Sequence, residues 1–211
     1  APQARLAGTD VDEEALAWCR STPWGGRVDL RRCRPGPWLP WEDGSFDLIL
    51  SHSVMTHLPA DEQVAWSHEL GRVLRPGGRL LATVLGPRAA RWTAQPEERQ
   101  ELERRGVCDR RRDRALRGVL PDFAYRTTYQ TEAWTRAHWS GVETVEVAPG
   151  AGSGLQDLVV AARRAPAALS SGATSPTARR ARGAGRALLV TGTHRSGTTF
   201  VGRMLAEAPE A

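Results

Sequence analysis

Residues 39–84 read LPWEDGSFDLILSHSVMTHLPADEQVAWSHELGRVLRPGGRLLATV. The apolar run at 46–50 suits a strand that is buried on both faces of a parallel sheet. Apolar side chains then recur at helical spacing up to Leu74, and residues 75–78 (Arg-Pro-Gly-Gly) end that helix, because proline cannot continue it and glycine accepts a left-handed turn. A second buried strand is expected at 80–85. This order predicts one parallel α/β crossover.

Length and composition limit the classes of protein to consider. The chain has 211 residues, enough for one domain and part of another, and its 40% hydrophobic content can supply a core. No apolar run approaches the ~20 residues of a membrane span, and no secretory signal is seen, so we expect a cytoplasmic protein that does not bind membranes. Cys19, Cys33 and Cys108 form no CxxC pair, so neither a metal site nor a disulfide framework is indicated.

The charge is +5, with 29 basic residues, all of them arginine, against 24 acidic ones. Nucleic-acid binding would need basic residues gathered on one face. The densest cluster, residues 104–117, is interleaved with Asp109 and Asp113, which is typical of a solvated helical face. No nucleic-acid partner is therefore expected.

Further elements are predicted N-terminal to the segment 39–84. Residues 5–10 form a short strand, and Asp12 is placed to cap a helix that runs to about Arg20, with acidic residues in its first turn. Residues 27–30 are a weaker strand candidate. A loop rich in Pro, Gly and Trp, 34–41, then leads to the strand at 46.

Beyond residue 85 the chain is polar and Arg-rich to about Arg117, which predicts a helical insertion that covers the site. A helix is expected at 131–139. Two closing strands, at 142–147 and 155–162, are separated by a glycine-rich turn.

Composition changes sharply at 163–185, where Ala, Gly, Ser, Pro and Arg dominate and aromatic and acidic residues are absent. Such a segment is typical of a disordered linker. The apolar strand pattern at 187–191 is then expected to open a second domain. The predicted organisation is a first domain over 1–164, a linker over 165–185 and the beginning of a second domain over 186–211.

The motifs LPWEDGSFD and VLRPGG resemble the second half of class I S-adenosylmethionine-dependent methyltransferases. Tyr129-Gln130-Thr131 and Gln156-Asp157 resemble the closing segment of methyltransferases found beside glycosyltransferases, so that the likeness covers residues 5–164. The resemblance implies an α/β, Rossmann-like sheet, mostly parallel with its last strand antiparallel. It also implies S-adenosylmethionine as the methyl donor and a small molecule or glycan as acceptor.

The resemblance also implies the cofactor-binding residues. Asp10, followed by Val11, takes the place of the acidic residue that holds both ribose hydroxyls, which a carboxylate can do by accepting two hydrogen bonds. The alternative is that Asp10 only caps the helix, although Asp12 is better placed for that. Cys33 and Arg34 fall where the family flanks the adenine, with a poor match to its pattern.

After the strand at 46, the resemblance implies that Ser51 and His52 line the methionine end of the cofactor. His57, in THLP, is interpreted as a structural residue, and no catalytic base is assigned. Methyl transfer needs a positioned and desolvated acceptor rather than a metal or a covalent intermediate.

One hallmark of the family is absent from its expected place. The GxGxG loop follows the family's first strand, which lies in the middle of the sheet, but only nine residues precede Asp10. We therefore expect a chain that lacks the first strand, in which two central strands lose a partner. A fragment of this kind is expected to be inactive on its own.

A second motif is VTGTHRSGTTFVGRML, which starts at Val190. Its GxxxxGxT spacing is close to a phosphate-binding P-loop, but Thr198 stands where a nucleotidase has Lys. The motif resembles the 5′-phosphosulfate loop of sulfotransferases that use 3′-phosphoadenylyl sulfate. The residues implied to bind that cofactor are Arg195, Ser196, Gly197, Thr198 and Thr199.

Three functions stay open at this point. The first is a methyltransferase domain fused to the start of a sulfotransferase. The second is a nonenzymatic binding module with a methyltransferase-like fold, which an upstream GxGxG would exclude. The third is a P-loop nucleotide kinase or hydrolase, against which the absence of Lys argues. The acceptor atom and the oligomeric state are left open.

Overall fold

The computed structural model describes residues 4–23, 25–112, 125–164 and 187–191. Within them the strands are β1 (Arg5–Asp10), β2 (Val28–Arg32), β3 (Phe46–Ser51), β4 (Leu74–Val84), β5 (Val107–Arg112), β6 (Arg126–Gln130), β7 (Val142–Ala148), β8 (Asp157–Arg163) and β9 (Ala187–Thr191). The α-helices are α1 (Glu13–Ser21), α2 (Ala60–Val73), α3 (Pro87–Thr93), α4 (Pro96–Arg105) and α5 (Glu132–His138). Two 3-10 helices, η1 (Gly25–Arg27) and η2 (Met55–His57), complete the described elements.

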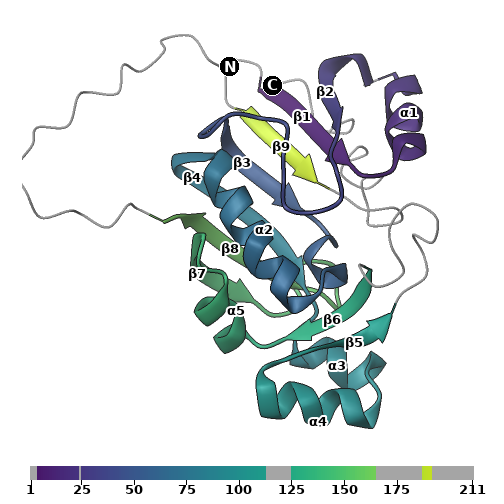
Figure 1. Cartoon of the computed structure of the whole chain (residues 1–211), viewed down its shortest axis with the longest axis vertical. Helices are drawn as coiled ribbons and strands as arrows, with labels where there is room; N and C mark the ends of the chain where they lie inside the picture. Colours follow the sequence, from purple (N-terminus) through teal and green to yellow (C-terminus); the bar gives the residue numbers. More distant parts are fainter. Residues whose placement is uncertain (1–3, 24, 113–124, 165–186, 192–211) are drawn as a thin grey trace, which may run out of the picture.

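Seven of the described strands form one sheet in the order β2-β1-β9-β3-β4-β8-β7 (Figure 1). The strands β2, β1, β9, β3 and β4 are mutually parallel, whereas β8 runs antiparallel to both β4 and β7. The chain moves outward from β1 to β2 on one side and from β3 to β4 on the other. The order of strands therefore reverses between β1 and β3, which is the place where open α/β sheets bind ligands at their carboxyl ends.

Strand β9 corrects the expectation of a gap in the sheet. Ala187–Thr191 pairs in parallel with β1, where Leu189 lies opposite Ala7, and with β3, where Leu189 lies opposite Ile49. The two central strands thus have a partner, and the prediction that their ladders stay unpaired is wrong. The sequence pattern correctly predicted a strand here but assigned it to a separate domain.

The crossover from β3 through α2 to β4 forms as predicted, with a different boundary. Helix α2 ends at Val73, one residue earlier than expected, and Leu74 already pairs with Phe46 as the first residue of β4. Gly77 has a φ of +79°, a conformation that favours glycine, and the register of the β3–β4 ladder shifts near this point. The strand expected at 80–85 is therefore the second part of a longer strand.

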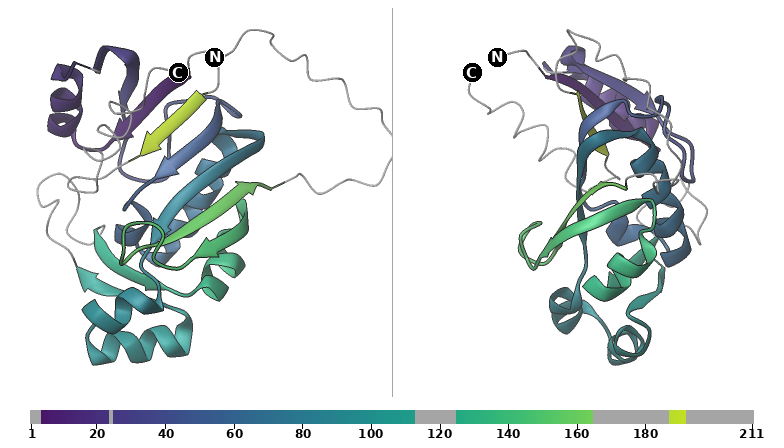
Figure 2. Two further views of the ribbon diagram at one scale, coloured as in Figure 1. Left: turned by 180° about the vertical axis from the view of Figure 1, so that it is seen from behind. Right: turned by 90° about the vertical axis from the view of Figure 1, so that its left-hand side faces the viewer.

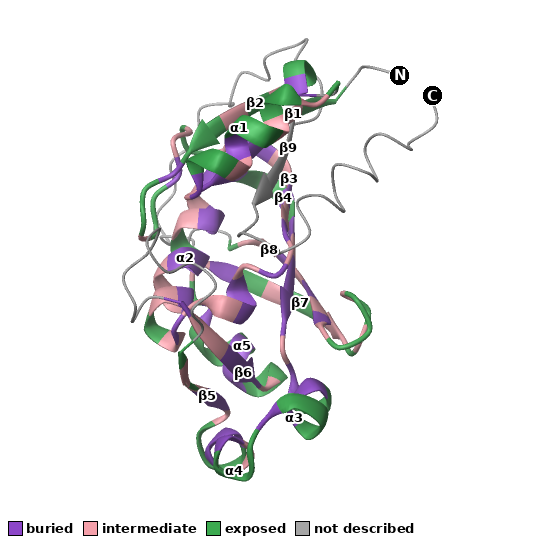
Figure 3. Cartoon of the chain, turned by 90° about the vertical axis from the view of Figure 1, so that its right-hand side faces the viewer, coloured by how far each residue is buried: buried purple, intermediate pink, exposed green. Residues whose placement is uncertain are grey.

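Helices α2 and α5 lie on the same face of the sheet (Figure 2). The apolar side of α2, including Trp66 and Leu70, packs on buried residues of β4 and β8 in the main core. Trp139, directly after α5, is fully buried in the same cluster. Figure 3 shows the buried stretches of α2 in purple. Burial of these side chains supplies the main driving force for this layer.

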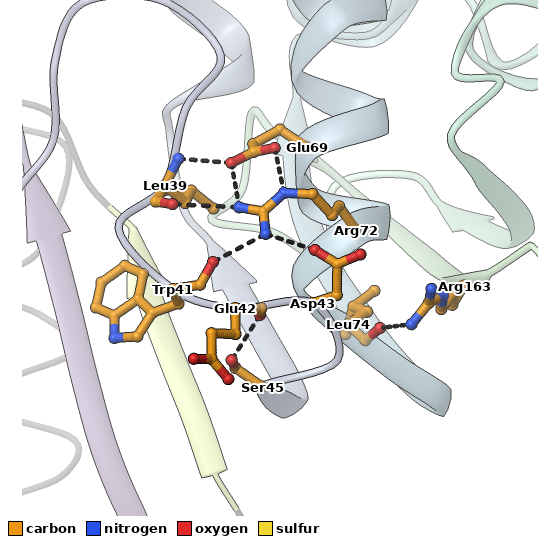
Figure 4. A network of polar contacts seen from close by, with 9 residues as sticks. All are labelled: Leu39, Trp41, Glu42, Asp43, Ser45, Glu69, Arg72, Leu74 and Arg163. Atoms are coloured by element: carbon orange, nitrogen blue, oxygen red, sulfur yellow. Dashed lines mark hydrogen bonds and ion pairs between the residues drawn. The ribbon is translucent and has the colours of Figure 1, made fainter. Parts of the chain in front are cut away.

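The loop between β2 and β3 is fastened to α2 by one arginine (Figure 4). The guanidinium of Arg72 donates hydrogen bonds to Glu69 in the same helix, to Asp43 at 2.8 Å and to the backbone oxygens of Leu39 and Trp41. The hydrogen bonds that Arg72 donates to Glu69 and Asp43 raise the pKa of its guanidinium against the opposing effect of burial. These contacts therefore hold the loop that precedes β3 against α2.

The insertion after β4 is only partly helical. Helices α3 and α4 are followed by β5, which pairs antiparallel with β6 in a separate two-stranded sheet. The interpretation of residues 104–117 as a helical face holds for Arg104 and Arg105, the last residues of α4, but is wrong over 106–112. Gly106 adopts a left-handed φ of +75°, and 107–112 is a strand. Residues 113–117 of that cluster lie outside the described residues. We call α3, α4, β5 and β6 the lobe.

The remaining predicted elements have the expected type. Strand β1 and helix α1 have the predicted positions, and β2, α5, β7 and β8 agree with prediction within about two residues at each end. The linker predicted over 165–185 and the residues of the predicted second domain other than 187–191 lie outside the described residues.

Candidate functional site

The carboxyl ends of β1 and β3 lie on either side of β9 and carry the first candidate residues. Asp10 is the last residue of β1 and is 4% exposed, and Ser51 is the last residue of β3 and is 1% exposed. Because neighbouring strands lie about 4.8 Å apart, these two strand ends are separated by roughly 10 Å. The strand order thus brings together two predicted residues that are 41 positions apart in the sequence.

Asp10 and Asp12 have different roles, as predicted for Asp12. The Asp12 carboxylate accepts hydrogen bonds from the backbone N–H of Glu14 and Ala15 and so caps α1. Asp10 Oδ1 accepts the Asp12 N–H at 3.0 Å, which fixes its side chain at the strand end. The helix therefore has its cap from Asp12 and does not need Asp10 for it. Val11 lies between the two, half-buried.

Cys33 lies beside Asp10, whereas Arg34 points elsewhere. The backbone N–H of Cys33 donates to the backbone oxygen of Asp10 at 3.0 Å, directly after β2. Burial raises the pKa of the Cys33 thiol, and the nearby Asp10 charge acts in the same direction, so the thiol stays protonated near neutral pH. Arg34 is exposed, with its guanidinium 5.6 Å from the ring centroid of Trp38.

Ser51 offers a buried group that suits a ligand. Its Oγ is buried and has no hydrogen-bond partner among the described residues. Leaving such a hydroxyl unsatisfied costs free energy, which a bound polar ligand would recover. His52 follows it, half-buried at the start of the loop after β3.

Ser53 ends the loop Ser51-His52-Ser53 that the resemblance implies at the methionine end, but its backbone conformation was not predicted from the sequence. It is the single described residue other than glycine with a positive φ, +59°. Its backbone N–H donates to Thr83 Oγ1 at 2.7 Å, and Thr56 Oγ1 donates to its backbone oxygen at 3.0 Å. Backbone strain of this kind persists where surrounding contacts fix it, and it is frequent at binding sites. No glycine or asparagine marked this turn in the sequence.

Gln156 contacts Ser53 across the sheet. Its Nε2 donates to Ser53 Oγ at 2.9 Å, although the residues are 103 positions apart. Gln156 directly precedes β8, whose first residue, Asp157, accepts the Gly150 N–H at 2.8 Å. A Cβ on Gly86 would lie 1.8 Å from the Asp157 carboxylate, so this anchor requires glycine at position 86. The sequence resemblance singled out this Gln-Asp pair but gave it no role.

The lobe packs against the loop after β3. The hydroxyl of Thr128 in β6 donates to the backbone oxygen of Leu58 at 2.7 Å. His57 Nδ1 lies 3.1 Å from the backbone oxygen of Arg126, and its ring stacks on Tyr125 with centroids 4.3 Å apart. These contacts agree with the interpretation of His57 as a structural residue. They also place the lobe next to the loop that carries Ser53.

The phosphosulfate residues predicted from the second motif, 195–199, lie outside the described residues. Among the residues that the structure describes, no group of His, Cys, Asp and Glu is placed to hold a metal ion. Within the same ranges, no helix is long and apolar enough to cross a membrane.

Two kinds of comparison identify this architecture. Residues 1–82 match the family model described as "Methyltransferase domain". The structure is similar to an S-adenosylmethionine-dependent methyltransferase from Mesorhizobium loti, with a TM-score of 0.57 and 17% identity over 76% of this chain and 81% of that one. The chain has the fold of a class I S-adenosylmethionine-dependent methyltransferase. A methyltransferase of the same description from Methanosarcina mazei has a TM-score of 0.52 and 18% identity, covering 74% of this chain and 81% of that one.

Part of the chain also matches a curated relative. It is an uncharacterized protein of Haemophilus influenzae, 32% identical over 80 residues. The match covers 36% of this chain and 32% of the relative, so it spans about a third of that protein. The family model, by contrast, matches the N-terminal part of the chain, where Asp10 and Ser51 lie.

Proposed function

We propose that residues 4–164, together with β9, form a domain that binds S-adenosylmethionine and transfers its methyl group to a small molecule or glycan. The observation that carries the proposal is the pair of strand ends at the reversal point of the sheet, where Asp10 and Ser51 lie buried on either side of β9. A carboxylate there suits the vicinal hydroxyls of a ribose, and a buried hydroxyl without a partner suits the polar end of the same ligand.

In this proposal the protein's side chains bind the cofactor and orient the methyl acceptor. Asp10 accepts hydrogen bonds from the ribose hydroxyls, while its own contact to the Asp12 N–H holds its side chain in place. Ser51 provides a hydrogen bond at the amino-acid end. Bound S-adenosylmethionine supplies an activated methyl group on a sulfonium. The rigid loop at Ser53 and the lobe beside it exclude water and orient the acceptor against that methyl group.

The expectation that this chain is inactive on its own rested on the missing first strand and on the missing GxGxG loop. Since β9 lies between β1 and β3, the first of these two reasons no longer applies. Binding by the chain itself is therefore the first property to measure.

The test is calorimetric titration of the full chain with S-adenosylhomocysteine. Asp10→Asn keeps an oxygen for the Asp12 N–H but removes the charge, and binding should weaken about tenfold or more. Asp12→Asn is the matched control, because asparagine caps helices as well as aspartate does and affinity should stay within about twofold. Absence of binding by the unaltered chain would reject the enzyme and favour the nonenzymatic binding module.

The second motif has two candidate roles. Its resemblance to a sulfotransferase loop supports binding of 3′-phosphoadenylyl sulfate by a second enzyme fused to the methyltransferase. Its position in the chain favours another role, because Gly192 directly follows β9, the strand between β1 and β3. The methyltransferase family has its glycine loop after the strand in that place. The same residues are thus candidates for the cofactor loop of the methyltransferase.

One variant separates these roles. Arg195→Ala should weaken binding of adenosine 3′,5′-bisphosphate, and leave S-adenosylhomocysteine binding unchanged, if the motif belongs to a sulfotransferase. Weaker binding of S-adenosylhomocysteine would instead assign the motif to the methyltransferase site. The nearby Arg203→Ala is a control for the loss of one positive charge.

A further inference from the structure

The loop after β3 and the turn before β8 are joined by a short relay of side chains. Gln156 Nε2 donates to Ser53 Oγ at 2.9 Å, and Ser53 Oγ lies 3.4 Å from Thr56 Oγ1. The Ser53 N–H is held by Thr83 in β4. Three separate segments of the chain therefore fix one small group of polar atoms at the carboxyl edge of the sheet.

The donors and acceptors in this relay determine which atom of the Gln156 side-chain amide faces Ser53. Thr56 Oγ1 donates its proton to the backbone oxygen of Ser53 at 3.0 Å, so the Ser53 hydroxyl donates to Thr56. Ser53 Oγ must then accept from Gln156, which requires that the amide nitrogen faces it. The Oε1 of Gln156 is left on the other side, buried and without a hydrogen-bond partner among the described residues.

The backbone around Gln156 keeps this oxygen in place. The Gly152 N–H donates to the backbone oxygen of Gln156 at 2.9 Å, and Asp157 is anchored on the Gly150 N–H. A Cβ on Gly152 would lie 2.7 Å from the Thr83 side chain and 3.0 Å from the backbone oxygen of Gln156. The turn thus packs tightly on β4, and Gln156 has little freedom to satisfy its Oε1 by moving.

The position of Gln156 in the sheet separates it from the ribose end of the site. Between the ends of β1 and β8 lie β9, β3 and β4, so Asp10 and Gln156 are about 19 Å apart by strand spacing. Gln156 instead lies on the side of the lobe, which packs against the loop carrying Ser53. A ligand that reaches from Asp10 past Ser51 brings its far end toward this group.

We propose that Gln156 Oε1 is a recognition group for the methyl acceptor and accepts a hydrogen bond from an O–H or N–H of that molecule. This assignment rests on the proposed function and narrows the acceptor to an alcohol, a phenol or an amine. Gln156 is a specificity residue and not a base, because an amide oxygen takes up no proton near neutral pH. A molecule without a donor would leave a buried oxygen unsatisfied and bind about tenfold more weakly.

The test uses three monosubstituted benzenes of similar size: phenol and aniline, which carry a donor, and toluene, which does not. Their dissociation constants are measured by NMR titration of the full chain with and without S-adenosylhomocysteine. The quantity of interest is the preference for phenol or aniline over toluene. Gln156→Leu should reduce that preference about tenfold, and Gln156→Glu, which keeps an acceptor oxygen, should retain it.

The matched control is Gln100→Leu, the same substitution at an exposed position of α4, which should leave the preference unchanged. An equal preference in the unaltered chain and in Gln156→Leu overturns the inference, and so does failure of all three probes to bind the unaltered chain. Titration without S-adenosylhomocysteine keeps the two proposals apart. Loss of S-adenosylhomocysteine binding rejects the proposed function, while the preference for donors still reports on Gln156.

Discussion

The indole N–H of Trp139 donates a hydrogen bond of 3.1 Å to the side-chain oxygen of Gln63, which lies 76 residues earlier in the chain. Both side chains are fully buried, with 0% exposure. The amide nitrogen of Gln63 donates in turn to the backbone oxygen of Met55 at 2.8 Å. One glutamine in α2 thus joins the end of α5 to the 3-10 helix beside the candidate site.

Replacing this glutamine should therefore affect stability strongly. Gln63→Leu has a similar volume but leaves the Trp139 N–H and the Met55 oxygen buried without partners, and should lower the free energy of unfolding by roughly 2–4 kcal/mol. Urea denaturation followed by tryptophan fluorescence measures the change. Gln100→Leu, on the exposed side of α4, should change it by less than about 0.5 kcal/mol. Equal midpoints for the two variants would contradict the role of Gln63.

Two glycines allow α2 to approach the start of β7 closely. A Cβ on Gly141 would lie 2.2 Å from the Cα of His68, and one on Gly71 would lie 2.3 Å from the Gly141 oxygen. Gly141→Ala must therefore push α2 outward and should cost roughly 2–4 kcal/mol of stability. Gly26→Ala has nothing within 4 Å of the new Cβ and serves as the control. Thermal unfolding of both variants by circular dichroism distinguishes them, and a Gly141→Ala variant as stable as Gly26→Ala would show that the contact is not needed.

Glu98 makes part of the stability of the lobe depend on pH. Burial alone would raise the pKa of the Glu98 carboxyl, but hydrogen bonds from Arg111 and from the Gln95 N–H outweigh it and hold the pKa below its ordinary value of 4.5. A carboxyl with a depressed pKa stabilises the fold above its unfolded pKa, and this contribution is lost as the pH falls through the folded pKa. The lobe should therefore weaken as the pH falls below about 4.5.

The measurement compares urea midpoints between about pH 7 and about pH 3. Glu98→Gln should be less stable than the unaltered chain by roughly 1–2 kcal/mol near neutral pH, with the difference shrinking in acid. Glu97→Gln, an exposed neighbour in the same helical turn, controls for the change of net charge. A difference between Glu98→Gln and the unaltered chain that stays constant over this range would exclude a titrating Glu98–Arg111 pair.

The sequence predicted local elements better than their partners. The apolar run of β3 and the helical spacing of α2 determine those elements from within a few residues, so both were found. Strand β5 was missed because its arginines resemble a helical surface, and its pairing with β6 comes from residues about twenty positions away. The neighbours of β9 are equally invisible to a local pattern, since a buried parallel strand looks the same in any sheet.

The candidate site shows the same limit. Asp10 and Ser51 could be proposed as candidates because motifs that resemble the family's surround them. The contact between Ser53 and Gln156 joins residues 103 positions apart. It also depends on a positive φ at Ser53, which the sequence does not indicate because no glycine occupies that position. Such a contact becomes visible only when the order of the strands is known.

The position of β9 leads to the last prediction. Each N–H of a central parallel strand donates to a neighbouring strand, so proline at Leu189, which lies opposite Ala7 and Ile49, removes a ladder hydrogen bond. Leu189→Pro should lower stability by about 3 kcal/mol or more and speed hydrogen exchange in β1 and β3. Val145→Pro is the control, because Val145 lies at the irregular point of the edge strand β7 and has no paired residue there. If Leu189→Pro leaves the exchange of β1 and β3 unchanged, residues 187–191 act outside this sheet, as the start of the separate domain that their sequence pattern predicted.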